Sequence, residues 1–206
     1  MNAARQIELL SEDEYFELDE RSTRKHEFWC GQVILRKAAT PQHVILAGQI
    51  VTALATRLSE TLCEVGTSDL KVKANDEIYV FPDVVVWCEN AQLDACRDNV
   101  LLNPLVLVEI LSLSTESIDR GAKLAAYQTI SSLLDYLIVW PDMVQIEHYA
   151  RQNETDWRFR RYLNRNQTIE FAALGLEIPV AEFYRRLDVP EGVINLELPF
   201  ESETDE

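Results

Sequence analysis

The runs FPDVVVW at residues 81–87 and LVLVEIL at residues 105–111 decide how this chain folds, because both have the length and apolar character of buried strands. Each run carries one acidic residue, Asp83 in the first and Glu109 in the second. Burying an ionised carboxylate is costly unless a cation lies close to it. The sequence therefore predicts that both carboxylates face one small site and share a positive partner, which is a divalent metal, a lysine or both.

A lysine is available on the segment that follows the second run. Asp119, Lys123 and Tyr127 have the i, i+4 spacing of one helix face, and the short loop 112–114 would return the chain to Glu109. Two carboxylates would bind Mg²⁺ through oxygen, and a lysine beside them would orient a water molecule or stabilise a pentavalent phosphorus. This arrangement points to phosphoryl chemistry.

Length and composition limit the class of protein. The chain has 206 residues, of which 47% are hydrophobic, so one globular domain over residues 1–200 is expected. It has no apolar run of about 18 residues and no signal peptide. Cys30, Cys63, Cys88 and Cys96 show no CxxC spacing, so we expect reduced thiols in a cytoplasmic protein.

The net charge of −16 argues against a broad basic surface for nucleic acid. A local basic groove remains compatible with it, because salt screens charges beyond roughly 8 Å. Part of the excess acid lies in residues 201–206, which we expect to be a disordered tail.

The remaining elements predict an α/β or α+β fold. Ser11 and Glu14 have capping-box spacing, and Thr40 with Pro41 begins a longer helix. Segments 105–111 and 134–140 flank a helix and so form a parallel crossover unit. The other predicted elements are a hairpin at 26–35, strands at 62–65, 70–74, 78–87, 144–149, 157–163 and 168–171, a loop at 89–103 and a helical turn at 182–187. Together they predict a mixed central sheet flanked by helices, with added hairpins.

The Pro82-Asp83 pair and the Glu109-Ile110-Leu111 run resemble the PD-(D/E)xK nuclease superfamily, with leucine where its lysine usually stands. More narrowly, the chain is similar to the Uma2 family (DUF820) of restriction-endonuclease-like proteins over residues 10–187. In that family the lysine has moved to the next helix, which matches Lys123. One departure is Leu113, where the family usually has proline. The stretches that carry the resemblance are 11–15, 24–31, 43, 79–86, 104–115, 119–127 and 136–139.

The resemblance implies a restriction-endonuclease-like fold and an endonuclease that hydrolyses DNA with Mg²⁺, or with Mn²⁺ in its place, to leave a 5′-phosphate. It implies catalytic roles for Asp83, Glu109 and Lys123, with Glu27 near the N-terminal hairpin as a further acid. The metal is expected at Asp83, Glu109 and Ile110. A homodimer would suit double-strand cleavage. The alternative is a protein that keeps this fold but serves as a binding or regulatory module.

Several residues have simpler interpretations. Asp83 could cap a turn, Glu109 could form a buried pair with an arginine, and Lys123 could pair with Asp119 on a solvated face. His43 is expected to be a surface or core histidine rather than a ligand or base. Arginines around one predicted hairpin either track a phosphate backbone or form a solvated strand face; they are Arg151, Arg158, Arg160, Arg161 and Arg165.

Overall fold

The computed structural model of the chain describes residues 9–111 and 119–193. The predicted loop 112–114, the cap at Ser114 or Thr115, the side chain of Asp119 and the tail 201–206 lie outside the described residues.

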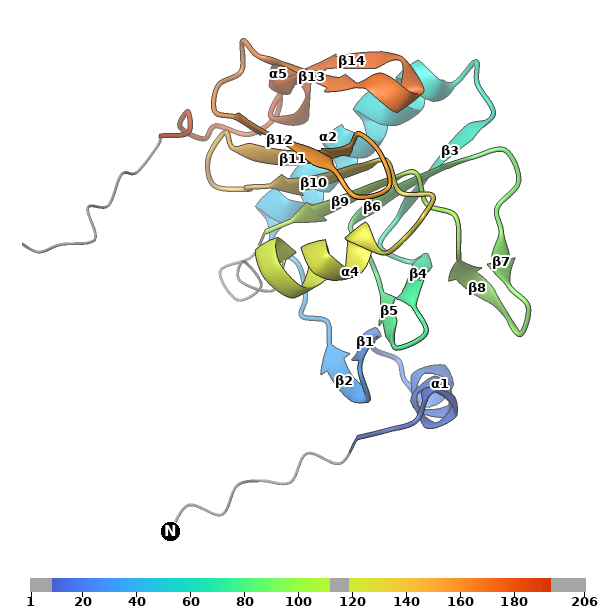
Figure 1. Cartoon of the computed structure of the whole chain (residues 1–206). Coiled ribbons are helices and arrows are strands. Elements are labelled where there is room, and N and C mark those ends of the chain that lie inside the picture. Colours follow the sequence, from blue (N-terminus) through green and yellow to red (C-terminus); the bar gives the residue numbers. More distant parts are fainter. Residues whose placement is uncertain (1–8, 112–118, 194–206) are drawn as a thin grey trace, which may run out of the picture.

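Two six-stranded mixed sheets organise the described part of the chain (Figure 1). The first, which we call the N-terminal sheet, has the order β2-β1-β5-β4-β8-β7, and the second, the central sheet, has the order β12-β11-β10-β9-β6-β3. In chain order the strands of the N-terminal sheet are β1 (His26–Trp29), β2 (Gln32–Leu35), β4 (Lys71–Asn75), β5 (Ile78–Val80), β7 (Leu93–Asp94) and β8 (Arg97–Leu101). Those of the central sheet are β3 (Cys63–Thr67), β6 (Val84–Cys88), β9 (Val106–Ile110), β10 (Asp135–Val139), β11 (Ile146–Arg151) and β12 (Trp157–Tyr162).

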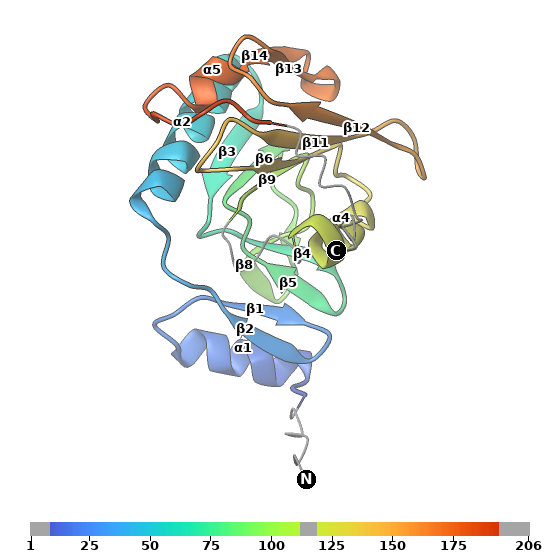
Figure 2. The same ribbon diagram turned by 90° about the vertical axis from the view of Figure 1, so that its left-hand side faces the viewer.

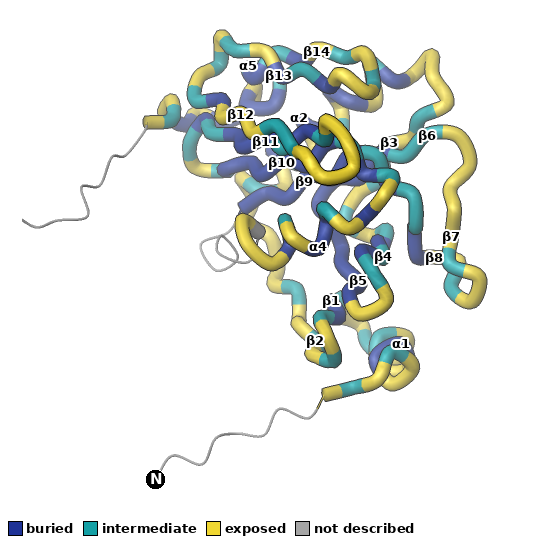
Figure 3. Tube along the Cα trace, viewed as in Figure 1, coloured by how far each residue is buried: buried dark blue, intermediate teal, exposed yellow. Residues whose placement is uncertain are grey.

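The central sheet is covered on both faces. Helix α2 (Pro41–Leu58), the short helix α5 (Val180–Phe183) and the hairpin of β13 (Thr168–Phe171) and β14 (Leu176–Pro179) pack on one face, as Figure 2 shows. The other face packs against α4 (Leu124–Gln128) and part of the N-terminal sheet. Strands between two covered faces must be apolar throughout, which explains the continuous runs in the sequence. Figure 3 shows this buried centre.

Local sequence signals account for several elements. Ser11 and Glu14 form the predicted capping box of α1 (Glu12–Arg21), and Thr40 accepts a hydrogen bond from the His43 amide at the start of α2. The β1–β2 hairpin turns at Cys30 and Gly31, which both have positive φ, as a two-residue hairpin turn requires. The parallel pairing of β9 with β10 confirms the crossover unit.

The structure corrects three element predictions. Residues 78–87 form two strands in different sheets, because the chain leaves the N-terminal sheet after β5 and enters the central sheet at β6. The predicted loop 89–103 contains β7 and β8, and β8 pairs in parallel with β4. Strand β14 was missed, and the last helical turn is α5, earlier than the predicted 182–187.

The structure also corrects the prediction for two cysteines. Cys63 and Cys88 are register partners on β3 and β6 and form a disulfide, whereas Cys30 and Cys96 are free and exposed. No CxxC spacing signals this pair, because its members lie 25 residues apart and meet only through strand register.

Titration of thiols in denaturant without reductant should therefore find the two thiols of Cys30 and Cys96. Closing a loop of this length by a disulfide is worth about 3 kcal/mol through the unfolded state, so reductant should also lower the melting temperature. A count of four thiols in freshly purified, unreduced protein would contradict the pairing.

Candidate functional site

The candidate site lies where the chain passes from the N-terminal sheet to the central sheet. Residues 81–83 make this crossing, and their backbone is held on both sides. The Phe81 amide donates to Glu27 Oε1 at 3.2 Å, the Phe81 carbonyl accepts from Arg36, and the Asp83 amide donates to the Val108 carbonyl at 3.1 Å. This crossing fixes the position of Asp83 between the two sheets.

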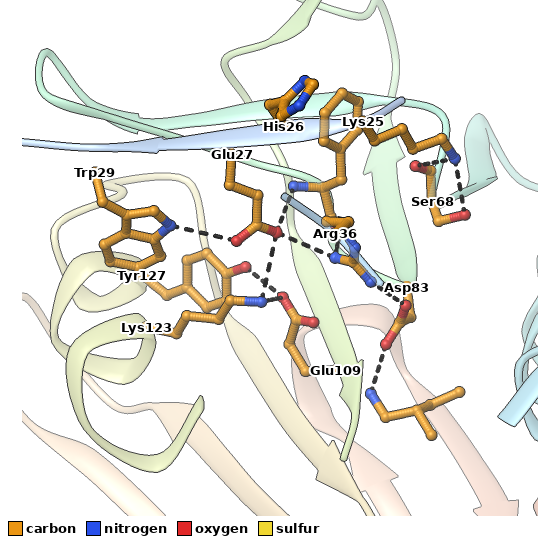
Figure 4. A network of polar contacts seen from close by, with 12 residues as sticks. Lys25, His26, Glu27, Trp29, Arg36, Ser68, Asp83, Glu109, Lys123 and Tyr127 are labelled. Atoms are coloured by element: carbon orange, nitrogen blue, oxygen red, sulfur yellow. Dashed lines mark hydrogen bonds and ion pairs between the residues drawn. The ribbon is translucent and has the colours of Figure 1, made fainter. Parts of the chain in front are cut away.

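Three buried carboxylates meet here. Glu27 comes from β1, Asp83 directly precedes β6, and Glu109 lies on β9, and each is at most 5% exposed. Neighbours of Glu109 on its strand, Leu107 and Leu111, pack on the face covered by α4, which is the face to which alternation assigns Glu109. The structure thus brings together the acidic residues that the sequence and the resemblance singled out (Figure 4).

Lys123 joins two of these carboxylates. Its Nζ lies 2.9 Å from Glu109 Oε1 and 3.7 Å from Glu27 Oε1, and the side chain is 6% exposed. Lys123 ends a π-helical turn, Asp119–Lys123, that runs directly into α4. Few helices contain a π-helical turn, and those turns are found frequently at functional sites.

Tyr127 completes this side of the site, one α-helical turn after Lys123. Its hydroxyl donates to Glu109 Oε1 at 2.6 Å, and the side chain is fully buried. Burial, together with the nearby Glu109 carboxylate, raises the pKa of Tyr127 well above its usual value, so the hydroxyl keeps its proton and remains a donor. The i, i+4 spacing predicts that Lys123 and Tyr127 share a helix face and that Lys123 points towards Glu109, and in the structure both side chains contact Glu109.

Arg36 was not singled out from the sequence, yet it links two of the acids. It follows β2, and its guanidinium donates to Glu27 Oε1 at 3.1 Å and to Asp83 Oδ1 at 2.7 Å. Burial disfavours its charge, but the carboxylates of Glu109, Asp83 and Glu27 outweigh burial and raise the pKa of Arg36. No sequence pattern identifies it, because β2 is a short, largely exposed strand without a clear periodicity.

His43 also belongs to the site, contrary to the expectation of an ordinary surface or core histidine. Its Nε2 lies 3.1 Å from Asp83 Oδ1. The first turn of α2 brings it there, because Thr40 caps the helix and orients its start. A capped helix start is visible in the sequence, but the residue that it faces is not.

The electrostatics keep two of the acids ionised. Burial raises the pKa of Asp83, but a hydrogen bond with His43 and the charge of Arg36 outweigh it and leave the pKa lowered. Burial likewise opposes ionisation of Glu27, and Lys123 with Arg36 lowers its pKa overall. Each of the three carboxylates is therefore paired with Arg36 or Lys123.

The donor set suits a hard cation, because Mg²⁺ prefers carboxylate oxygens. Within residues 9–111 and 119–193, however, no three His, Cys, Asp or Glu side chains are arranged as a ready metal cage. The guanidinium of Arg36 is the counterion of Asp83 and contacts Oδ1, and the Ile110 amide donates to Oδ2 at 2.8 Å. Asp83 and Glu109 are thus the residues that would hold a metal, and Arg36 would have to release Asp83.

The arginines of the predicted hairpin make structural contacts instead of forming one cluster. Arg151 donates to the carbonyls of Leu133, Gln128 and Ile130, and Arg161 pairs with the buried Glu147 at 2.8 Å. Arg160 pairs with Glu170 and Arg165 with Glu191; Arg158 lies 3.9 Å from Glu170. These contacts favour the interpretation as a strand face over a phosphate track.

Comparison with known proteins identifies the family of this chain. The model of the Uma2 family, described as "Putative restriction endonuclease", matches residues 12–181. Two uncharacterized proteins from Synechocystis are similar to this chain. The protein slr1290 is 34% identical over 86% of this chain and 93% of its own length. The protein sll1609 is 28% identical over 80% of this chain and 93% of its own length.

A solved structure shares the fold. It is a crystal structure described as "a putative nuclease belonging to DUF820" from Anabaena variabilis, with a TM-score of 0.69 and 13% identity over 84% of this chain and 96% of that one. Among the described residues, no helix is long and apolar enough to cross a membrane. Since the family model covers most of the sequence, including Glu27, Asp83, Glu109 and Lys123, this chain belongs to the Uma2 family.

Proposed function

We propose that this protein is a Mg²⁺-dependent endonuclease that hydrolyses phosphodiester bonds in DNA. The observation that carries the proposal is a chain of contacts at the junction of two sheets, in which Lys123 pairs with Glu109 and Glu27 and Arg36 links Glu27 to Asp83. The three acids and the lysine come from four separate parts of the chain. Buried acids beside a buried lysine are costly to assemble, and such combinations cluster at functional sites.

In the proposed reaction a water oxygen bonds to phosphorus, the bond from phosphorus to the 3′ oxygen breaks, and that oxygen takes a proton, which leaves a 5′-phosphate. Mg²⁺ held by Asp83 and Glu109 would activate the water and offset phosphate charge. Lys123, fixed by Glu109, would offer its ammonium to the phosphate oxygens as charge develops there. Tyr127 holds the Glu109 carboxylate in its orientation.

One observation favours a second function, a DNA-binding or regulatory module without turnover. Arg36 is fixed on both Glu27 and Asp83, so the acids are largely neutralised within the protein itself. A fold that had lost its metal would be stabilised by such an arginine.

Conversion of supercoiled plasmid to nicked circles separates the two functions. Wild-type protein with Mg²⁺ or Mn²⁺ should nick the plasmid, and Asp83→Asn or Glu109→Gln should lower the rate by about 100-fold or more. Glu182→Gln, which removes a carboxylate paired with Arg57 outside the site, should cleave like wild type. If folded wild-type protein binds DNA but never cuts it with either metal at any salt concentration, the module is the better description.

A further inference from the structure

A pocket of about 600 Å³ opens beside the candidate site. Its lining includes Arg36 and Asp83, so the pocket reaches one of the three carboxylates and the arginine that links it to Glu27. Figure 4 shows Lys25 and Ser68, which also line it, on the side of Arg36 away from Lys123. The remaining lining residues are Arg24, Leu35, Lys37, Ala38 and Ala39.

The charge of this basic pocket is opposite to that of the protein. Among the described residues that line it, four of nine are the cations Arg24, Lys25, Arg36 and Lys37, and Asp83 is the single acid. The chain as a whole has 35 acidic residues against 19 lysines and arginines. Helix α2 begins at Pro41, directly after the lining residues, and the positive end of its dipole adds to the field. Anions are therefore attracted to this entrance and repelled by much of the remaining surface.

Two of the four cations are available to a ligand. Arg36 is held by Glu27 and Asp83, whereas Lys25 donates to the Ser68 carbonyl at 2.9 Å and pairs with the exposed Asp69. Arg24 and Lys37 are exposed and have no ion pair within the described part of the chain. Exposed cations without an acidic partner, next to a buried acidic site, are suited to phosphate groups.

We infer that the basic pocket binds the phosphates of a single DNA strand on one side of the scissile phosphate, an inference that rests on the proposed function. The pocket has the volume of a small-ligand site, and its few cations cannot match the six to ten phosphate contacts typical of duplex binders. None of the lining residues within 9–111 and 119–193 is aromatic, so we expect contact with the backbone and not base stacking.

Fluorescence anisotropy with a labelled 12-nucleotide single strand, in EDTA to prevent cleavage, tests this inference. If Arg24 and Lys37 each neutralise a phosphate, the logarithm of the affinity should fall against log salt with a slope of about −1.4. In Arg24→Gln/Lys37→Gln the slope should shrink towards zero, and the affinity at low salt should fall about tenfold or more.

The matched control is Arg185→Gln/Arg186→Gln, which removes the same charge from two adjacent exposed arginines that line a different pocket. It should bind the strand like wild type. An equal loss in this control would assign the effect to net charge and overturn the inference, as would unchanged binding by the Arg24/Lys37 variant. Tighter binding of the matching duplex than of the single strand would overturn the choice of ligand.

Cleavage assays keep this inference separate from the proposed function. If wild-type protein never cuts but its binding still depends on Arg24 and Lys37, the endonuclease proposal fails and the pocket stands. If wild type cuts, and the Arg24/Lys37 variant cuts with the same KM, the pocket inference fails alone.

Discussion

Replacing Lys123 with methionine should abolish most DNA cleavage and also destabilise the fold. Lys123 Nζ lies 2.9 Å from Glu109 Oε1 and 3.7 Å from Glu27 Oε1, so its loss removes the shared cation of two buried carboxylates. Breaking such a pair typically costs about 3–5 kcal/mol. The cleavage rate of the protein that remains folded should fall about 10²–10³-fold, because in the proposed reaction the ammonium offsets charge on the phosphate. Denaturant unfolding and plasmid nicking measure the two effects.

Lys71→Met is the matched control for this variant. Lys71 is also buried, 1% exposed, and pairs with Asp19 at 2.7 Å, outside the candidate site. The Lys71→Met substitution should lower the free energy of unfolding by a comparable amount but leave the cleavage rate of folded protein unchanged. The double variant Glu109→Gln/Lys123→Met should regain part of the stability, since both charges are then gone, but no cleavage. Cleavage at the wild-type rate by folded Lys123→Met would contradict the role given to this lysine.

Replacing Arg36 with methionine should make the protein bind Mn²⁺ at least about tenfold more tightly. Two unit charges 4 Å apart interact by about 4 kcal/mol at an effective dielectric constant of 20, and each 1.4 kcal/mol is tenfold in affinity. Arg36 lies on Asp83 Oδ1 at 2.7 Å, so it competes with a cation for this carboxylate. Isothermal titration calorimetry with Mn²⁺ measures the change.

Thermal unfolding provides a second test of the competition between Arg36 and the metal. Without Arg36, the buried Asp83 and Glu27 lose a counterion, so metal-free Arg36→Met should melt lower than wild type, and Mn²⁺ should restore more of its melting temperature. Arg36→Lys keeps the charge and should bind Mn²⁺ nearly like wild type. Arg57→Met, which breaks the pair with Glu182 elsewhere, should not change Mn²⁺ affinity. Weaker Mn²⁺ binding by Arg36→Met would mean that Arg36 builds the site and does not compete with the metal.

The sequence predicted the centre of the site from the cost of burying charge. Asp83 and Glu109 stand in runs too apolar to carry an acid for packing alone, and the helical spacing of Lys123 directed it towards Glu109, where it lies. The contact of Tyr127 with the same carboxylate is seen only in the structure. The capping box, the N-cap of α2 and the parallel crossover were also predictable, since each depends on residues close in sequence or on a local period. Glu27 came from the family resemblance, because a single glutamate in a short strand carries no local signal.

What the sequence determined by itself is which residues must be buried and which of those carry charge, since hydrophobic periodicity and desolvation act locally. Only the tertiary structure decided which charges meet. Residues 78–87 read as one apolar run, yet they cross between two sheets, and that crossing brings Arg36 and His43 to Asp83. The Cys63–Cys88 disulfide and the pairing of β8 with β4 likewise depend on strand register over long sequence separations. Pairing between distant strands is set by the packing of the whole chain, which no local pattern encodes.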